Sequence, residues 1–253
     1  MDQINCRAFF DKVMETPHLQ NEFITTYLAN GQPVFDTARL QIWLQHYSKA
    51  LLVLMAAVNA LAGSPSQGTE LTFLQLQNTP YQSRGIYAIG HCMAITVQYS
   101  KKSATTGCNS LIPHALDAFC QEIIKVVVFR THPFAQQIVK ILYPGRDDIL
   151  NLWNNYLFVN KDCLFTTEDL SGILETVSLK TMGIPVGVRE YRHIQVFIRW
   201  THCSTMWSSL GLRDEDSTAA LQAGHQLETE EQLYGMSGSY LGQIPEYLVE
   251  PLL

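Results

Sequence analysis

The sequence predicts a mostly α-helical protein with a small antiparallel β-hairpin or sheet, which is an α+β fold. Apolar residues recur at three- and four-residue spacing along most of the 253 residues, as amphipathic helices require. Two β-branched and aromatic runs, 86–89 and 94–99, flank Gly90 and have the composition of a hairpin. A hydrophobic content of 47% with 16% charged residues indicates a packed globular chain rather than a disordered one.

Glycine, proline and helix-capping residues divide the rest of the chain into elements. Asp36 or Thr37 is placed to cap a long helix, whose apolar part from Ala50 to Ala62 is too short to span a membrane and predicts a buried core helix. Further helices are expected at 3–30 (two, broken by Pro17), from 66–69 onward, 113–129, 131–143, 147–156, 167–182 (capped by Thr167), 188–206, 217–223 and 228–234. Turns are expected at 30–33 and 183–187, and paired strands at 157–159 and 163–165.

Two segments near the C-terminus carry the residues best suited to chemistry. Arg189, Arg192 and His193 occupy the first segment, and His225 is followed nine residues later by Tyr234 in the second. Guanidiniums are planar, permanently charged groups that match phosphate oxygens. A tyrosine hydroxyl can act as a nucleophile, and a histidine can transfer a proton near neutral pH. The set therefore suits attack on a phosphodiester without a metal ion.

The order and spacing of these segments resemble the C-terminal boxes of the tyrosine recombinase (phage integrase-like) superfamily. In that family His-x-x-Arg-His precedes Leu-Gly-His, and the nucleophilic tyrosine lies nine residues further on. Arg189 stands here at the first histidine position, and Arg192, His225 and Tyr234 match the later ones. Tyr-Arg-His-Ile at 191–194 and Gln-Ala-Gly-His at 222–225 are more similar to the recombinase-like domain of fungal Crypton elements and fungal telomere-linked helicases.

The resemblance extends upstream, to about residue 35. In the family, the turn that lies here at 63–71 and restarts a helix carries the first catalytic arginine, but Gln67 stands at that position. Loss of one such donor typically lowers a rate by about 10²–10³. A lysine on or after the hairpin protonates the leaving 5′-oxygen in the family, which makes Lys101 the first candidate and Lys102 the second. Adjacent lysines at a strand end are also a common protection of a sheet edge.

The resemblance implies DNA strand cleavage and rejoining through a 3′-phosphotyrosine on Tyr234, with no metal, nucleotide or other cofactor. Catalytic roles fall to Tyr234, Arg192, His225, Lys101 and Arg189. DNA contacts are expected from Arg189, Arg192, His193, Arg199, Lys102 and Gln67. The implied partners are DNA and further copies of the chain that assemble on it, and no membrane is involved. The implied location is intracellular, and nuclear if the chain binds DNA.

The net charge of −6 favours a weaker grip on DNA than most DNA-binding proteins have. Charge is uneven, however, with five basic residues and one acidic residue between Lys180 and Arg213. Acidic residues at 214–216 and 228–231 lie close to Tyr234 in sequence. Two alternatives stay open: an inactive, decayed copy of a mobile element, and a helical interaction or structural module in which the arginines form a solvated helix face.

Six scattered cysteines form no Cys-x-x-Cys pair, which favours reduced, mostly buried thiols in an intracellular protein. The sequence also lacks a phosphate-binding Gly-x-x-x-x-Gly-Lys motif. We expect a partial N-terminal helical segment at 1–34, a recombinase-like domain at 35–236 and a tail at 237–253. The first segment is shorter than the helical arm of recombinases, as in a fragment, a decayed copy or one piece of a helicase-linked product.

Overall fold

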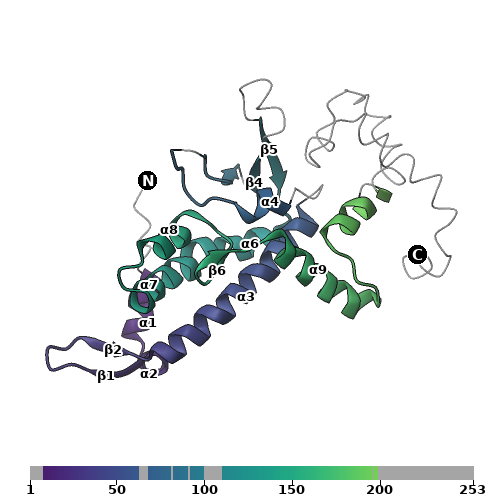
Figure 1. The fold of residues 1–253 in the computed structure, drawn as a ribbon. Coiled ribbons are helices and arrows are strands. Elements are labelled where there is room, and N and C mark those ends of the chain that lie inside the picture. Colours follow the sequence, from purple (N-terminus) through teal and green to yellow (C-terminus); the bar gives the residue numbers. More distant parts are fainter. Residues whose placement is uncertain are drawn as a thin grey trace.

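A computed structural model describes residues 8–62, 68–80, 82–90, 92–99, 110–195 and 197–198. Helices dominate these residues, and the strands form small antiparallel sheets, so the predicted α+β class is confirmed (Figure 1).

The long helix α3 (Thr37–Leu61) runs through the molecule, from a β-hairpin at one end to α4 and α9 at the other (Figure 1). Asp36 caps it by accepting a hydrogen bond from the Arg39 N–H at 3.1 Å, which decides between the two predicted caps. Its buried face forms the centre of the core, as expected for 50–62. Residues on that face are Leu40, Leu44, Leu51, Met55 and Val58.

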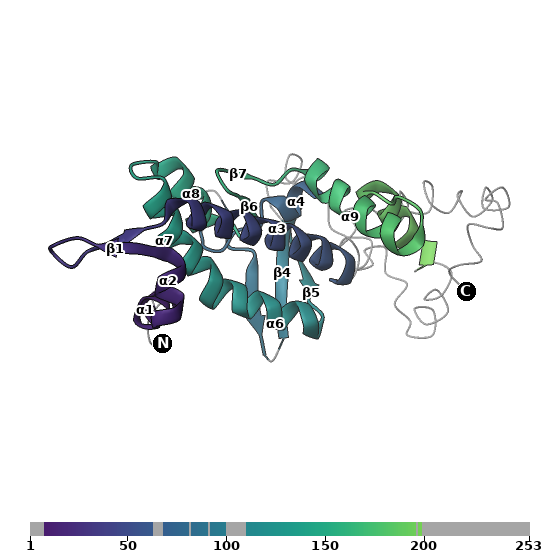
Figure 2. The same ribbon diagram turned by 90° about the horizontal axis from the view of Figure 1, so that it is seen from below.

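The other helices pack around α3 (Figure 2). They are α1 (Ala8–Glu15), α2 (Pro17–Phe23), α4 (Gly68–Thr72), α6 (Ala118–Val126), α7 (His132–Leu142), α8 (Asp147–Asn155) and α9 (Thr167–Met182). Val13 of α1 belongs to the same hydrophobic core as Trp153 of α8 and Leu170 of α9. Thr166 caps α9, one residue before the predicted cap, and forms a capping box with Asp169.

Three antiparallel sheets are described. Strands β3 (Ile86–Ile89) and β4 (Cys92–Tyr99) form the predicted hairpin, and β6 (Val159–Asn160) pairs with β7 (Cys163–Leu164) as predicted. Strand β5 (Ser110–Ala115) adds a third strand beside β4.

The prediction of a helix from Pro113 was wrong. Pro113 and His114 lie in β5, paired with Thr96 and Ile95 of β4. Proline is common in the first turn of a helix, but it is also tolerated in an edge strand, where a missing N–H disturbs no ladder. Because β5 is an edge strand, Pro113 fits there. The helix starts later, at α6, where the Asp117 side chain accepts from the Cys120 N–H at 2.6 Å.

Residues 24–35 form a hairpin that the sequence analysis missed. Strands β1 (Ile24–Tyr27) and β2 (Pro33–Phe35) pair antiparallel and stand away from the helices (Figure 1). The expected turn is present, one or two residues earlier than predicted, with the Gly31 N–H donating to Leu28 O and φ +79° at Gly31. Tyr27, expected on a helix, is therefore in a strand.

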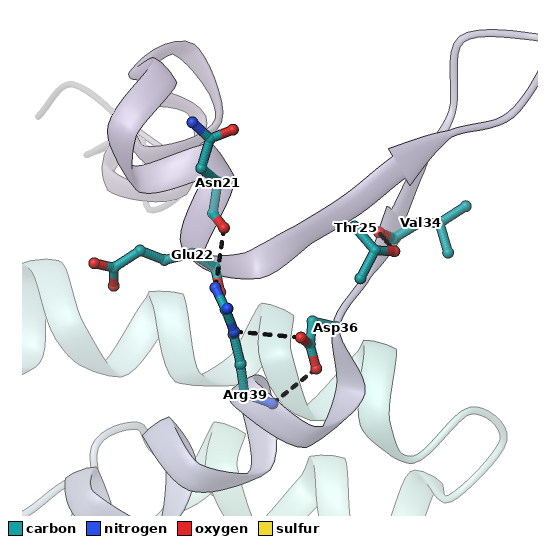
Figure 3. Close-up of polar contacts among 6 residues, drawn as sticks. All are labelled: Asn21, Glu22, Thr25, Val34, Asp36 and Arg39. Atoms are coloured by element: carbon teal, nitrogen blue, oxygen red, sulfur yellow. Dashed lines mark hydrogen bonds and ion pairs between the residues drawn. The ribbon is translucent and has the colours of Figure 1, made fainter.

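The base of this hairpin is fixed by Arg39 of α3 (Figure 3). Its guanidinium donates to the carbonyl oxygens of Asn21 at 3.0 Å and Glu22 at 3.3 Å, and lies 3.4 Å from the Asp36 carboxylate. The Thr25 hydroxyl also donates to Val34 O at 3.0 Å across the strands. The start of α3 and the hairpin thus share one set of polar contacts.

α6 and α7 are two parts of one continuous helix, although the sequence predicted a break near residue 130. A π-helical segment, Val127–Thr131, joins them, and the His132 N–H donates to Val127 O. Pro133 has no N–H, and its ring would clash with the carbonyl of Phe129 in a regular α-helix. The wider π turn accommodates the proline without ending the helix.

The π-helical segment places His132 inside the core. Its Nε2–H donates to the Trp153 carbonyl at 2.8 Å, which also accepts from Gln136 at 3.0 Å. Trp153 lies in the last turn of α8, where carbonyls have no partner within the helix. The other ring nitrogen, Nδ1, lies 3.5 Å from the Tyr47 hydroxyl, to which Thr131 donates at 3.2 Å. Burial lowers the pKa of His132 to about 4, so the ring is neutral.

The expectation of mostly buried cysteines fails for two of the three thiols that the structure describes. Cys120 is buried, whereas Cys92 and Cys163 are exposed and all three are free. Cys92 begins a strand and Cys163 follows a turn, and both positions leave one side of the residue in solvent.

Candidate functional site

Arg189, Arg192 and His193 lie on a helical segment, 188–195, that follows the predicted loop after α9. Gly183 ends α9 in the left-handed conformation, with φ 76°. The chain then folds back along α9, because the Ser178 hydroxyl accepts from the Val186 N–H at 2.7 Å and the Ser171 hydroxyl from the Val188 N–H at 3.3 Å. The new segment therefore starts beside α9.

Gly187 allows the close approach at this reversal. A Cβ at this position would lie 2.5 Å from Ser171 Oγ, 2.8 Å from Glu175 Oε1 and 2.9 Å from Glu190 Oε2. Real Cβ atoms do not come that close to other atoms, so a side chain here would push the segment away from α9. Val186 and Val188, on either side, are buried at 8% and 7% exposure.

Tyr191 ties the segment to the end of α3. Its hydroxyl donates to the Ala60 carbonyl at 2.9 Å and accepts from the Gln195 amide at 2.6 Å. Ala60 lies in the last turn of α3, so this hydrogen bond serves a carbonyl without a helical partner. Because residues 191 and 195 face α3, residues 189, 192 and 193 lie on another face of the same turns.

The charges of the two arginines on that face affect the pKa of His193. Arg189 and His193 are exposed and Arg192 is half-buried. The pKa of His193 is lowered, first by partial burial and then by the charges of Arg189 and Arg192, while Glu190 opposes the shift. This dependence places both guanidiniums near the imidazole. The structure thus brings together three of the predicted site residues as a positive patch with a neutral histidine.

The other predicted site residues lie outside the described residues. They are Tyr234, His225, Lys101, Lys102, Arg199 and Gln67. Three of them lie close in sequence to described elements. Gln67 immediately precedes α4, and Lys101 and Lys102 follow the end of β4. If Gln67 does not occupy the position of the family's first arginine, Arg84 and Arg130 are the substitutes to test. Arg84 lies 5.0 Å from the Tyr87 ring centre in a cation–π contact, and Arg130 is exposed on the π-helical segment.

Two features of the site were missed from the sequence. Tyr191 anchors the segment, although the sequence analysis used it only as part of a motif, and Ser171 and Ser178 hold the returning loop. A tyrosine between two arginines on a helix is a detectable signal, because it must face away from them. The serine contacts depend on the path of a loop, which no local pattern encodes.

Among the described residues, no three His, Cys, Asp or Glu side chains gather so that they could hold a metal ion. Within the same part of the chain, no helix is both long and apolar enough to cross a membrane.

Comparison with known proteins finds no matching family model, no matching curated protein and no matching solved structure.

Proposed function

We propose that this chain is a tyrosine recombinase-like domain that binds DNA through the 188–195 segment and cleaves and rejoins a strand through Tyr234. The observation that carries the proposal is the positive patch of Arg189, Arg192 and His193 on one turn of a helix that is tied to α3 through Tyr191. Arginines whose helix is already fixed lose little further freedom when they bind a phosphate.

The order of elements supports the same proposal. A long helix ends before Gln67, a short helix follows, and a hairpin leads into Lys101 before the arginine segment. This is the order that the family resemblance implies. The hydrogen bond from Tyr191 to Ala60 also puts the arginine segment at the end of α3 from which the chain continues toward Gln67.

In the proposed reaction the Tyr234 oxygen bonds to phosphorus while the bond from phosphorus to the 5′-oxygen breaks. Arg192 and Arg189 stabilise the charge that develops on the phosphate oxygens. Lys101 gives its proton to the leaving 5′-oxygen, and His225 takes the proton that the Tyr234 hydroxyl loses as it attacks. The strand is rejoined by the reverse sequence of steps.

Trapping on a nicked DNA substrate tests the catalytic part. A covalent adduct that resists denaturant is expected from the parent chain, and Tyr234→Phe should abolish it, since only the nucleophilic oxygen is removed. Because Gln67 replaces a guanidinium, the Gln67→Arg variant should give more adduct than the parent. If neither the parent nor Gln67→Arg forms an adduct, catalysis by this chain is excluded.

DNA affinity tests the binding part separately. Arg192→Ala removes a charge-assisted contact worth roughly 1.5–3 kcal/mol and should weaken binding by about 10- to 150-fold. It should also reduce the salt dependence by about one phosphate contact. Arg146→Ala is the matched control, since that exposed arginine pairs with Asp148 at 2.7 Å, away from the segment. Equal losses in both variants would argue against a DNA-binding role for the segment.

A non-catalytic interaction module is the second candidate. One observation favours it: the end of α9 and the residues that follow it expose several large apolar side chains, between 37% and 54% of each. They are Val177, Leu179, Met182, Ile184, Phe197 and Ile198. Absence of both DNA binding and adduct, with dimerisation or partner binding that Leu179→Ser abolishes, would favour this module.

A further inference from the structure

A hollow of about 330 Å³ lies on the first half of α3 and is unrelated to the arginine segment. Gln41, Ile42 and Gln45 of α3 line one side, and Tyr143 and Lys161 line the other. Ile42 is 18 residues from Ala60, which separates the two regions by about 27 Å along the helix. The volume is at the lower end of the range of small-molecule sites, which is about 300–1,000 Å³.

The lining combines apolar side chains with polar groups that can donate hydrogen bonds. Ile42 is 54% exposed at the hollow, and Leu44 beneath it is buried. The Gln41 and Gln45 amides and the Tyr143 hydroxyl can each donate a hydrogen bond. Among the described residues, Lys161 is the only charged one that lines the hollow, so its walls favour a negative ligand.

Two acidic residues, Asp148 and Asp162, do not line the hollow. Asp148 forms a two-point ion pair with Arg146, at 2.9 Å and 2.7 Å. The pKa of Arg146 is raised by this hydrogen bond first and, more weakly, by the charge of Asp162. Neither carboxylate is among the residues that line the hollow beside Lys161.

The backbone at Lys161 is in a conformation that lysine rarely adopts. Its φ is +54°, and within the described residues no other non-glycine residue has a positive φ. Lys161 and Asp162 form the turn between β6 and β7, where glycine is the usual residue at a positive φ. A non-glycine residue in this conformation costs about 1 kcal/mol or more.

Buried side chains fix this strained residue. The Lys161 N–H donates to the Ser48 hydroxyl at 3.2 Å, and its carbonyl accepts from the Trp153 indole at 2.7 Å. Ser48 and Trp153 are 2% and 0% exposed. The turn would keep these backbone bonds with glycine, so the lysine side chain is not needed for them.

We propose that the hollow binds a small organic anion, a carboxylate joined to a short apolar body. Lys161 holds the carboxylate together with the glutamine amides, and the apolar body lies against Ile42. Preorganisation explains the strained backbone, because a fixed lysine loses less freedom on binding than one in a mobile loop.

Titration of the full chain with benzoate tests this, monitored by isothermal calorimetry and by the NMR signals of the Ile42 methyl groups. Binding in the millimolar range is expected, with the Ile42 signals shifting. Benzyl alcohol, which has the same ring without the charge, should bind at least fivefold more weakly. Equal affinity for the two compounds, or unchanged Ile42 signals, would overturn the proposal.

Variants of the lysine complete the test. Lys161→Gln should weaken benzoate binding at least fivefold, while Lys161→Arg and the distant control Lys180→Gln should stay within twofold of the parent. Lys161→Gly should lose binding and unfold at an equal or higher temperature, because glycine relieves the positive φ. Unchanged binding by Lys161→Gln, or a less stable Lys161→Gly, would show that the lysine serves the fold and not a ligand.

Discussion

His132 and His193 lie on helices that are each tied to the last turn of another helix, yet they present different chemistry. In α7 the histidine itself is the tie, because His132 donates to the Trp153 carbonyl at the end of α8. In the 188–195 segment the tie is Tyr191, which donates to Ala60 at the end of α3. The second arrangement leaves His193 exposed beside two arginines, whereas the first buries His132 completely.

Both histidines have a lowered pKa, and burial is the largest cause at each, but the further causes differ. At His132 the backbone hydrogen bond to Trp153 opposes the shift. At His193 the charges of Arg189 and Arg192 add to the effect of partial burial. A lowered pKa therefore does not identify a functional histidine, and the charges around it carry that information.

The largest expected difference between the two is in stability. His132→Ala should lower the free energy of unfolding by about 3 kcal/mol, because it leaves a cavity among Tyr47 and Trp153 and removes a buried hydrogen bond. His193→Ala should change it by less than about 0.5 kcal/mol, as at other exposed positions. Urea unfolding measures both, and similar losses would mean that His193 is also a structural residue.

The pH dependence of stability should also distinguish His132 from His193. The unfolded His132 gains a proton near pH 6.5, while the native ring stays neutral down to about pH 4. Stability is therefore fully present above pH 6.5 and is lost as the pH falls to about 4, by up to about 3 kcal/mol. Unfolding curves between these values should show the loss in the parent and in the exposed-site control His46→Gln, but not in His132→Gln.

An NMR titration gives the same information where His132→Gln does not fold. The ring signals of His132 should show no protonation down to about pH 4. Protonation of the native ring near pH 6.5 would contradict the buried, hydrogen-bonded arrangement.

Substitution of two glycines near the 188–195 segment should change the stability of the chain in opposite directions. Gly187→Ala should destabilise the chain by roughly 1–3 kcal/mol, since its Cβ would meet Ser171 at 2.5 Å. Gly172→Ala, in the interior of α9 with open space around it, should stabilise by about 0.5–1 kcal/mol. Thermal unfolding of the pair distinguishes them, and two changes of the same sign would mean that the loop does not pack against α9 in this way.

A small and local effect is expected at Tyr191, which ties the segment to α3. Tyr191→Phe removes the hydrogen bonds to Ala60 and from Gln195 and should cost about 1–2 kcal/mol, with faster amide hydrogen exchange confined to residues 188–195. If Tyr191 also fixes the arginines for DNA, the same variant should weaken DNA binding without removing any charge. Tyr87→Phe is the control, because its ring contact with Arg84 does not need the hydroxyl.

Elements encoded by local signals were predictable. Asp36, Thr166 and the Gly145 and Gly183 turns mark helix ends within a residue or two, and the β3–β4 hairpin follows from its β-branched runs. Two of the errors, the helix predicted from residue 113 and the break predicted near residue 130, share a cause: each proline is compatible with two structures. Only the sheet order shows that Pro113 lies on an edge, and only the π-helical segment shows how the helix continues through Pro133.

The candidate site was predictable only where one helix carries it. Residues 189, 192 and 193 share a face because of helical spacing, which the sequence contains. Their attachment to α3 through Tyr191 joins residues 131 positions apart, and no short-range pattern encodes such a contact. The convergence of Tyr234, His225 and Lys101 on this patch stays a prediction.

The β1–β2 hairpin is a suitable place for a tag or label. Its chain from Phe23 to Phe35 carries no charged residue, and Tyr27 and Leu28 near its tip are each 51% exposed. Because Arg39 holds the hairpin at its base, a peptide tag or fluorescent label inserted at Asn30 would lie far from the core contacts of α3. Such a label would report on binding partners without displacing either histidine.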